Sequence, residues 1–328
     1  VFANNLFVEQ SEIPHADDMD DSMLRMLYVA CNDAIPVESQ LVFTLKSLCG
    51  FSVKETALRL FITKANVYKR FSRAKKYLQE QTIELDDLTD SDMANRLPMV
   101  YRVLYLVFTE GHLSSHTDMA IRKDLCEEAI RLTLLISQST VGNVPETYAL
   151  LALMYFHLSR MNARQDDSGA LLLLEQQDRS QWNKQYIAIG MGYMERSAQG
   201  EILSRYHVEA SIAAEHCLAP SFKKTRWDKI VASYKLLEQV SPSVLHQLNQ
   251  AIAMAEWQGP NAGLTVLQSI DSPIWLNSSY HWNAVLADLQ YRCGKTTLAQ
   301  KNTEQALQKA PTEDIKKMLR NRLEKYTL

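Results

Sequence analysis

The chain has 328 residues, of which 46% are hydrophobic and 22% are charged, and its formal net charge is −3. This composition is typical of a folded globular protein, and the length is sufficient for two domains. Because no apolar run approaches the roughly 18 residues that cross a bilayer, we expect no membrane-spanning helix.

The N-terminal residues and the cysteines indicate the cellular compartment of the protein. The first ten residues lack the basic and apolar segments of a secretory signal, so we expect a cytoplasmic protein. They also lack a starting Met, which indicates a processed or truncated piece. The five cysteines are scattered without a C-x-x-C pair, which favours reduced thiols in the core.

The N-terminal part predicts short helices after a linker at residues 1–20. Apolar residues recur at helical spacing within 21–32. Pro36 then stands where the first residue of a helix would lie, and the helix of 37–48 ends before Gly50.

Residues 53–76 predict two short helices joined by a tight turn. Ser52 and Glu55 match the S-x-x-E capping box that begins the first helix. Thr63 is the candidate N-cap of the second. This arrangement is a helix-turn-helix, and with the two preceding helices it predicts a four-helix unit over 21–80.

The second of these helices carries two different faces. Val67, Phe71, Ala74 and Leu78 form one apolar stripe at spacings of four, three and four. The remaining residues give a cationic face with amide, hydroxyl and aromatic groups among the charges. We expect this face to be Lys64, Ala65, Asn66, Tyr68, Lys69, Arg70, Ser72, Arg73, Lys75 and Lys76.

Such a face fits duplex DNA. Lys and Arg can contact phosphates or guanine edges, Asn can read adenine, and Ala can pack on a thymine methyl group. Residues 43–80 hold nine Lys or Arg against two Glu, between acidic flanks, and this local basic charge suits a polyanion. The alternative is a solvated helix face that happens to be basic.

The stretch from DDSMLRMLYVACNDAIPVESQLVF to SRAKKYL resembles region four of an extracytoplasmic-function (ECF) sigma factor. The resemblance implies binding to the −35 promoter element and to the β flap of core RNA polymerase. Carried over by position, the DNA-facing residues would be Lys64, Asn66, Tyr68, Lys69, Ser72 and Arg73. Region two of that family has no counterpart here, since the chain begins in what would be the linker between regions.

After an acidic linker at 81–92, residues 93–328 resemble the long helical C-terminal extension of one ECF subgroup. The matching stretches include ALLALMYFHLSRMNAR, LLLLEQQDRSQWN and LHQLNQAIAMAEWQGPNAGL. Helix signals follow one another there without strand-like alternation, so the expected fold is all-α.

An internal repeat marks the end of the extension. Ala251 and Gly259 recur as Ala287 and Gly294, about 36 residues later. The second copy matches much of the tetratricopeptide pattern, so we expect tetratricopeptide-like hairpins stacked into a short solenoid. An unknown protein or peptide could occupy its groove. Four tryptophans are expected to pack in the core or between repeats: Trp227, Trp257, Trp275 and Trp282.

Candidate metal sites are weak. His112 and His116 are four residues apart, but neighbouring Gly and Ser residues predict a polar loop instead. His207 and His216 are nine residues apart and would not align on one side of a helix. We therefore expect neither a metal nor a cofactor.

The residues before Trp182 form the last polar cluster of interest. Glu175, Asp178 and Arg179 could make a carboxylate site, but a buried Arg–carboxylate network bracing Trp182 is the preferred interpretation. Because the chain has no phosphate-binding loop and no nucleophile motif, we do not expect an enzyme.

Two functions follow from these patterns. In the first, the chain is a transcription initiation factor that binds promoter DNA and core RNA polymerase, and its helical extension modulates that activity. In the second, it is a helical-repeat interaction scaffold in which the helix-turn-helix contacts polymerase only.

Overall fold

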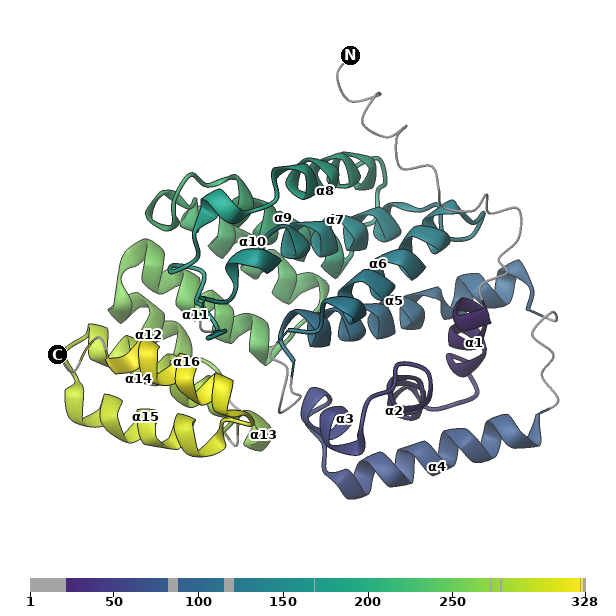
Figure 1. Ribbon diagram of the computed structural model, residues 1–328, viewed down its shortest axis with the longest axis horizontal. Coiled ribbons are helices and arrows are strands. Elements are labelled where there is room, and N and C mark those ends of the chain that lie inside the picture. Colours follow the sequence, from purple (N-terminus) through teal and green to yellow (C-terminus); the bar gives the residue numbers. More distant parts are fainter. Residues whose placement is uncertain are drawn as a thin grey trace, which may run out of the picture.

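The computed structural model describes residues 22–81, 88–114, 121–167, 169–271, 273–277, 279–324 and 326. The predicted all-α fold is confirmed: the described elements are helices, with one isolated β-bridge between Gln165 and Leu171 (Figure 1). None of the described helices combines the length and the apolar composition needed to cross a membrane. The expected linker at 1–20 and residues 82–87 of the expected acidic linker lie outside the described residues.

The N-terminal unit consists of four helices. They are α1 (Ser22–Ala30), α2 (Val37–Ser47), α3 (Val53–Arg59) and α4 (Lys64–Glu80). The capping box of α3 is present, because the Ser52 side chain accepts from the Glu55 backbone and the Glu55 carboxylate accepts from the Ser52 backbone. Val42, Ala57 and Val67 form a small core that joins α2, α3 and α4. Apolar burial therefore fixes the crossing of the helix-turn-helix.

The middle of the chain is a layer of helices built around a buried one. Its helices are α5 (Asp90–His112), α6 (Lys123–Gln138), α7 (Pro145–Ser159), α8 (Lys184–Ser197) and α9 (Arg205–Leu218). Almost every residue of α7 is buried, because α5, α6, α8 and α9 all pack against it. A helix that is apolar on all sides is expected in such a position. α5 begins at Asp90, within the segment expected as acidic linker.

The C-terminal part is a run of helical hairpins. It consists of α10 (Trp227–Val240), α11 (Val244–Gln258), α12 (Pro260–Gln268), α13 (Ile274–Asn277), α14 (Tyr280–Arg292), α15 (Thr296–Lys309) and α16 (Glu313–Glu324). Gly259 and Gly294 end α11 and α14 with φ of 92° and 74°, a conformation that glycine adopts without strain. Both helices place a fully buried alanine, Ala251 and Ala287, in the packed interior.

The extension curves back towards the helix-turn-helix. α1 and α2 pack against α5, and the chain then runs through α6 to α16, so that α13 returns close to the turn between α3 and α4 (Figure 1). There the rings of Phe61 and Trp275 lie 4.7 Å apart. The N-terminal unit is thus held by the extension at two separate places.

One tryptophan does not pack as expected. Trp257 is 46% exposed on α11, so its predicted role in core or inter-repeat packing is wrong. Trp275 and Trp282 are partly buried against the core of α11, α12 and α14.

Candidate nucleic-acid interface

The start of α4 is shaped by its turn. Thr63 caps the helix by accepting from the Asn66 backbone, as the sequence predicts. Phe61, two residues earlier, has φ of 53°, which is unusual for a residue with a side chain. This backbone turns the chain sharply enough to bring α4 across α3.

The predicted cationic face is on the surface. All ten predicted residues lie on α4, whose outer side forms an edge of the molecule in Figure 1. Nine of them are exposed, and Arg70 is half-buried. Lys76 lies 3.7 Å from Glu80 in a solvent-exposed pair, and the other cations of this face make no ion pair with described residues. The face therefore presents positive charge that the described protein leaves largely unneutralised.

The opposite side of α4 is anchored. Val67 and Ala74 are fully buried. Phe71 stacks on Phe43 of α2, with ring centroids 5.6 Å apart, and the ammonium group of Lys46 lies 4.5 Å from the Phe71 ring. Aromatic and cation–π contacts of this kind fix the rotation of the helix. The cationic face consequently has one defined orientation.

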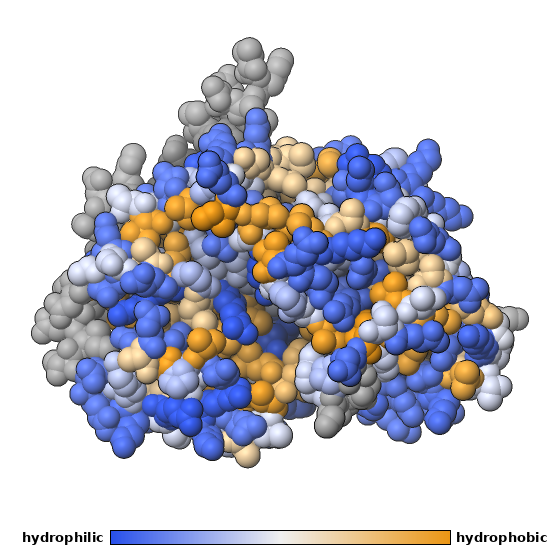
Figure 2. Space-filling view, turned by 180° about the vertical axis from the view of Figure 1, so that it is seen from behind, coloured by the Kyte–Doolittle hydropathy of each residue, from blue (hydrophilic) through white to orange (hydrophobic). Residues whose placement is uncertain are grey.

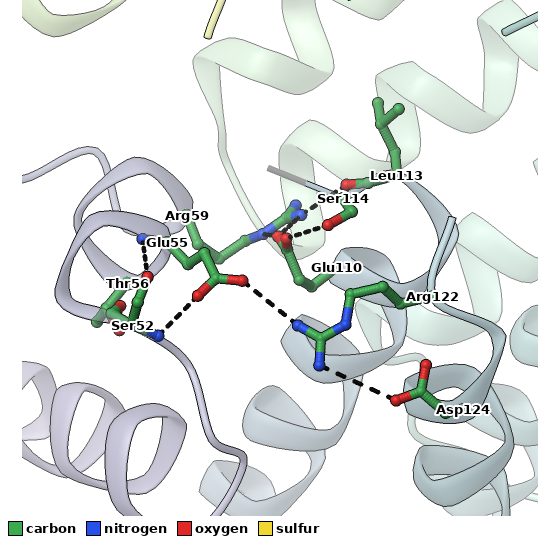
Figure 3. A network of polar contacts seen from close by, with 9 residues as sticks. All are labelled: Ser52, Glu55, Thr56, Arg59, Glu110, Leu113, Ser114, Arg122 and Asp124. Carbon is green, nitrogen blue, oxygen red and sulfur yellow. Dashed lines mark hydrogen bonds and ion pairs between the residues drawn. The ribbon is translucent and has the colours of Figure 1, made fainter. Parts of the chain in front are cut away.

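Two ion pairs join the helix-turn-helix to the extension (Figure 3). Arg59, at the end of α3, donates through both Nε and Nη2 to the fully buried carboxylate of Glu110 on α5, and also to the carbonyl of Leu113. Arg122 lies 3.3 Å from Glu55, the capping residue of α3. The short helix α3 is therefore tied to the extension near both ends.

Sequence reasoning missed these pairs. In the sequence, Arg59 is one of several basic residues of the helix-turn-helix, and nothing near it indicates an ion pair. Its partner is 51 positions away along the chain. A lone Glu at position 110 within an apolar helix is the one signal that could have indicated a buried partner.

The histidine candidates are structural. His112 is not in a loop, as the sequence suggested, but is the last residue of α5. Its ring lies 4.9 Å from that of His157, and Arg164 is within hydrogen-bond distance of its Nε2. His116 lies outside the described residues. Among those that are described, no group of three His, Cys, Asp or Glu residues could hold a metal ion.

The other two histidines considered as metal ligands, His207 and His216, serve capping and packing. His207 takes part in the capping box of α9, and His216 packs edge-on against Trp227. His207 therefore caps its own helix, and His216 packs between α9 and α10.

The predicted Arg–carboxylate network at Trp182 is wrong. Trp182 is buried, but its partner is the guanidinium of Arg179, 4.3 Å from the ring. Arg179 donates to the carbonyls of His216 and Ala219, whereas Asp178 is exposed and caps Ser180. A cation–π contact thus replaces the expected ion pair.

Comparison with known proteins gives three findings. A family model described as sigma-70, region 4 matches residues 25–78, and a family of unknown function (DUF6596) matches residues 96–198. The uncharacterized protein R00370 of Rhizobium meliloti (strain 1021) is 30% identical over 305 residues, which are 92% of this chain and 71% of that protein. No solved structure matches.

The Arg59–Glu110 pair yields a stability prediction. Glu110→Gln removes the carboxylate charge that pairs with the largely buried guanidinium of Arg59, so the free energy of unfolding should fall by about 3 kcal/mol. Glu80→Gln is the matched control, because the Lys76–Glu80 pair is exposed and should change stability by less than about 0.5 kcal/mol. Urea denaturation followed by tryptophan fluorescence measures both. Equal effects of the two substitutions would show that the pair does not stabilise the junction.

Proposed function

Because this chain belongs to the family of the Rhizobium meliloti relative and carries a sigma-70 region 4 domain, we propose that it is a transcription initiation factor. The single observation that carries the proposal is the outward, cationic face of α4, anchored from behind by Val67 and Ala74. A sigma region 4 implies contact with promoter DNA and with RNA polymerase. We assign the −35 element to α4 and the β flap of the core enzyme to the same unit.

The proposed division of the chain follows the same reasoning. Residues 21–80 form the region-four unit, 81–92 are the linker, and 93–328 are a helical extension with tetratricopeptide-like hairpins. Of the sigma factors, we place the chain with the ECF subgroup that carries such an extension. Its place of action would be the cytoplasm, where polymerase and promoter meet.

We expect residues at the start of α4 to contact bases and residues near its end to contact phosphates. In a helix-turn-helix the first residues of the second helix lie nearest to the bases. Lys64, Asn66 and Lys69 therefore belong to the base-proximal part, and Arg73 to the next turn. Lys76, near the far end of the helix, is placed to contact phosphates.

The extension would modulate DNA binding through the turn and not by covering the face. The cationic residues of α4 other than the half-buried Arg70 are exposed. Phe61, however, packs on Trp275, and Thr63 and Asn66 border the space between the turn and the extension. The end of α4 that should enter the groove first is therefore the end that α13 approaches. We expect a duplex docked there to compete with the contact between α13 and the turn.

Substitution of the face tests the DNA assignment. Lys69→Ala or Arg73→Ala should weaken binding by about 1–3 kcal/mol if the side chain reads a base. Lys76→Ala should instead lower affinity equally for all sequences and flatten the salt dependence. The probe is the duplex that the wild-type chain selects from a random library, titrated by gel shift. Lys184→Ala, an exposed lysine of α8, is the control, and unchanged binding by the α4 variants would refute the assigned face.

The Phe61–Trp275 contact gives a second prediction. Trp275→Ala should raise the DNA affinity of the full chain by about fivefold or more, because under the proposal the contact with Phe61 opposes DNA binding and this substitution removes it. Trp257→Ala, which alters an exposed tryptophan of the same extension, should leave affinity unchanged. The same gel-shift titration measures both. An unchanged or reduced affinity for Trp275→Ala would show that the extension does not restrain the turn.

The alternative function is a helical-repeat interaction scaffold, in which an unknown protein or peptide occupies the groove of the extension. The curved stack of hairpins supports it, since such stacks present long concave surfaces. Capture of core RNA polymerase by the immobilised chain, with and without selected duplex, separates the two functions. An initiation factor should retain polymerase and place it on the duplex, whereas the scaffold should retain polymerase without any effect of DNA.

A further inference from the structure

A large cavity lies between the helix-turn-helix and the extension. Its volume is about 1000 Å³, and its walls come from the α3–α4 turn, α5, α7, α9 to α11 and the α13–α16 region. Figure 2 shows the molecule hollowed near its middle, with hydrophobic residues around the opening. This volume is in the range of small-molecule sites, which combine apolar walls with a few polar groups that converge.

The charged groups on the wall are mostly cationic. Arg59, Arg160, Arg205 and Lys309 line the cavity, and Glu209 is the one carboxylate among the described lining residues. Glu110 pairs with Arg59, and Glu209 pairs with Arg205. These two cations are therefore neutralised by the protein itself.

Arg160 is different, because it has no carboxylate partner among the described residues. Only 7% of it is exposed, and its Nε is buried without a hydrogen-bond partner. One nitrogen of the guanidinium lies 2.8 Å from Nδ1 of His157, and the group is 5.8 Å from the Trp182 ring. Burial lowers the pKa of Arg160, and no Asp or Glu is among the groups that act on it.

The neighbours of Arg160 add to the positive field. Arg164 and Arg179 are the nearby guanidinium groups, and neither forms an ion pair with a described carboxylate. Burying a charge without a counter-charge costs several kcal/mol. A cation–π contact and carbonyl acceptors offset part of this cost for Arg179. Among the described residues, the neighbours of the Arg160 guanidinium are the His157 imidazole, the Cys217 thiol and the more distant Trp182 ring, and none of them is a carboxylate. The site is thus built to receive negative charge.

Two histidines complete the polar wall. Burial, and then Arg160 and Arg179, lower the pKa of His216 to about 3, and burial together with Arg160 lowers that of His157 well below its usual range. Both are therefore neutral near pH 7 and can donate or accept a hydrogen bond. Nδ1 of His216 is buried without a partner among the described residues.

We propose that this cavity binds a small organic anion, with its carboxylate or phosphate group against Arg160 and its apolar body along the hydrophobic wall. A guanidinium presents paired donors that match the oxygens of both groups. His157 and His216 would supply neutral hydrogen bonds beside it. Leu153, Ile212 and Ala213, from α7 and α9, provide apolar wall in the same part of the extension.

Binding to matched probes tests the proposal. Isothermal titration of the full chain with benzoate and phenyl phosphate should give saturable binding at one site. Benzamide and phenol, the uncharged counterparts, should bind at least about tenfold more weakly. Weaker binding of inorganic phosphate than of phenyl phosphate would show that the apolar body contributes to binding. Whichever of benzoate and phenyl phosphate binds more tightly shows whether the site prefers a carboxylate or a phosphate group. Failure of every anion to saturate by about 10 mM, or equal binding of the neutral probes, would overturn the proposal.

Substitution of Arg160 locates the site. Arg160→Gln should weaken the tighter anion by about tenfold or more. Arg131→Gln is the control, because Arg131 is an exposed residue of α6 that pairs with Glu128 and does not line the cavity. Equal binding by wild type and Arg160→Gln would refute the role of Arg160.

Hydrogen exchange on the wild-type chain covers the case in which Arg160→Gln fails to fold. Added anion should protect backbone amides around residues 153–160 and 205–216. Protection confined to other segments would overturn the proposal. Because these measurements contain no DNA, they can fail or succeed independently of the proposed initiation function.

Discussion

The buried ion pair between Arg59 and Glu110 joins the helix-turn-helix to the helical extension. Glu110 is fully buried on α5, where an unpaired carboxylate would be strongly unfavourable, so the end of α3 must stay beside it. α3 has only seven residues, so the ion pair adds to the small core through which it packs on α2 and α4. The orientation of α4 follows, because α4 crosses α3 over Val67 and Ala57. The placement of the proposed DNA-reading face therefore depends on a residue of the extension.

The same constraint creates the space in the middle of the molecule. The helix-turn-helix is fixed at α5 on one side, and α13 meets it again at Phe61 on the other. A cavity of about 1000 Å³ lies between these two attachments. Its wall joins Thr63 and Asn66, at the start of α4, to Arg160 in the extension. Any ligand there would lie in one continuous space with the proposed DNA-reading end.

The features of the fold that could be predicted from the sequence are those that depend on residues close together along the chain. The capping box at Ser52, the cap at Thr63 and the stripe through Val67 depend on neighbours within a few residues, and periodicity reveals them. The all-α fold follows from the same signals. Contacts such as Arg59 with Glu110 join residues 51 positions apart and leave no local trace. The prediction of an Arg–carboxylate network at Trp182 is wrong because Asp178 is next to Arg179 in the sequence but does not pair with it. Arg179 instead donates to the carbonyls of His216 and Ala219, at the end of α9.

The proposed control of the helix-turn-helix by the extension could act in two ways, and these contacts favour one of them. A lid would bury the cations of α4, but all of them except the half-buried Arg70 are exposed, so steric masking of the whole face does not fit. Control through the turn fits better, since the turn carries a residue at φ of 53° whose ring packs on Trp275. Such a backbone is held by its surroundings, and loss of the aromatic contact would let it relax. Under the proposed control, a change at the cavity wall would affect α4 without any group contacting its DNA-facing side.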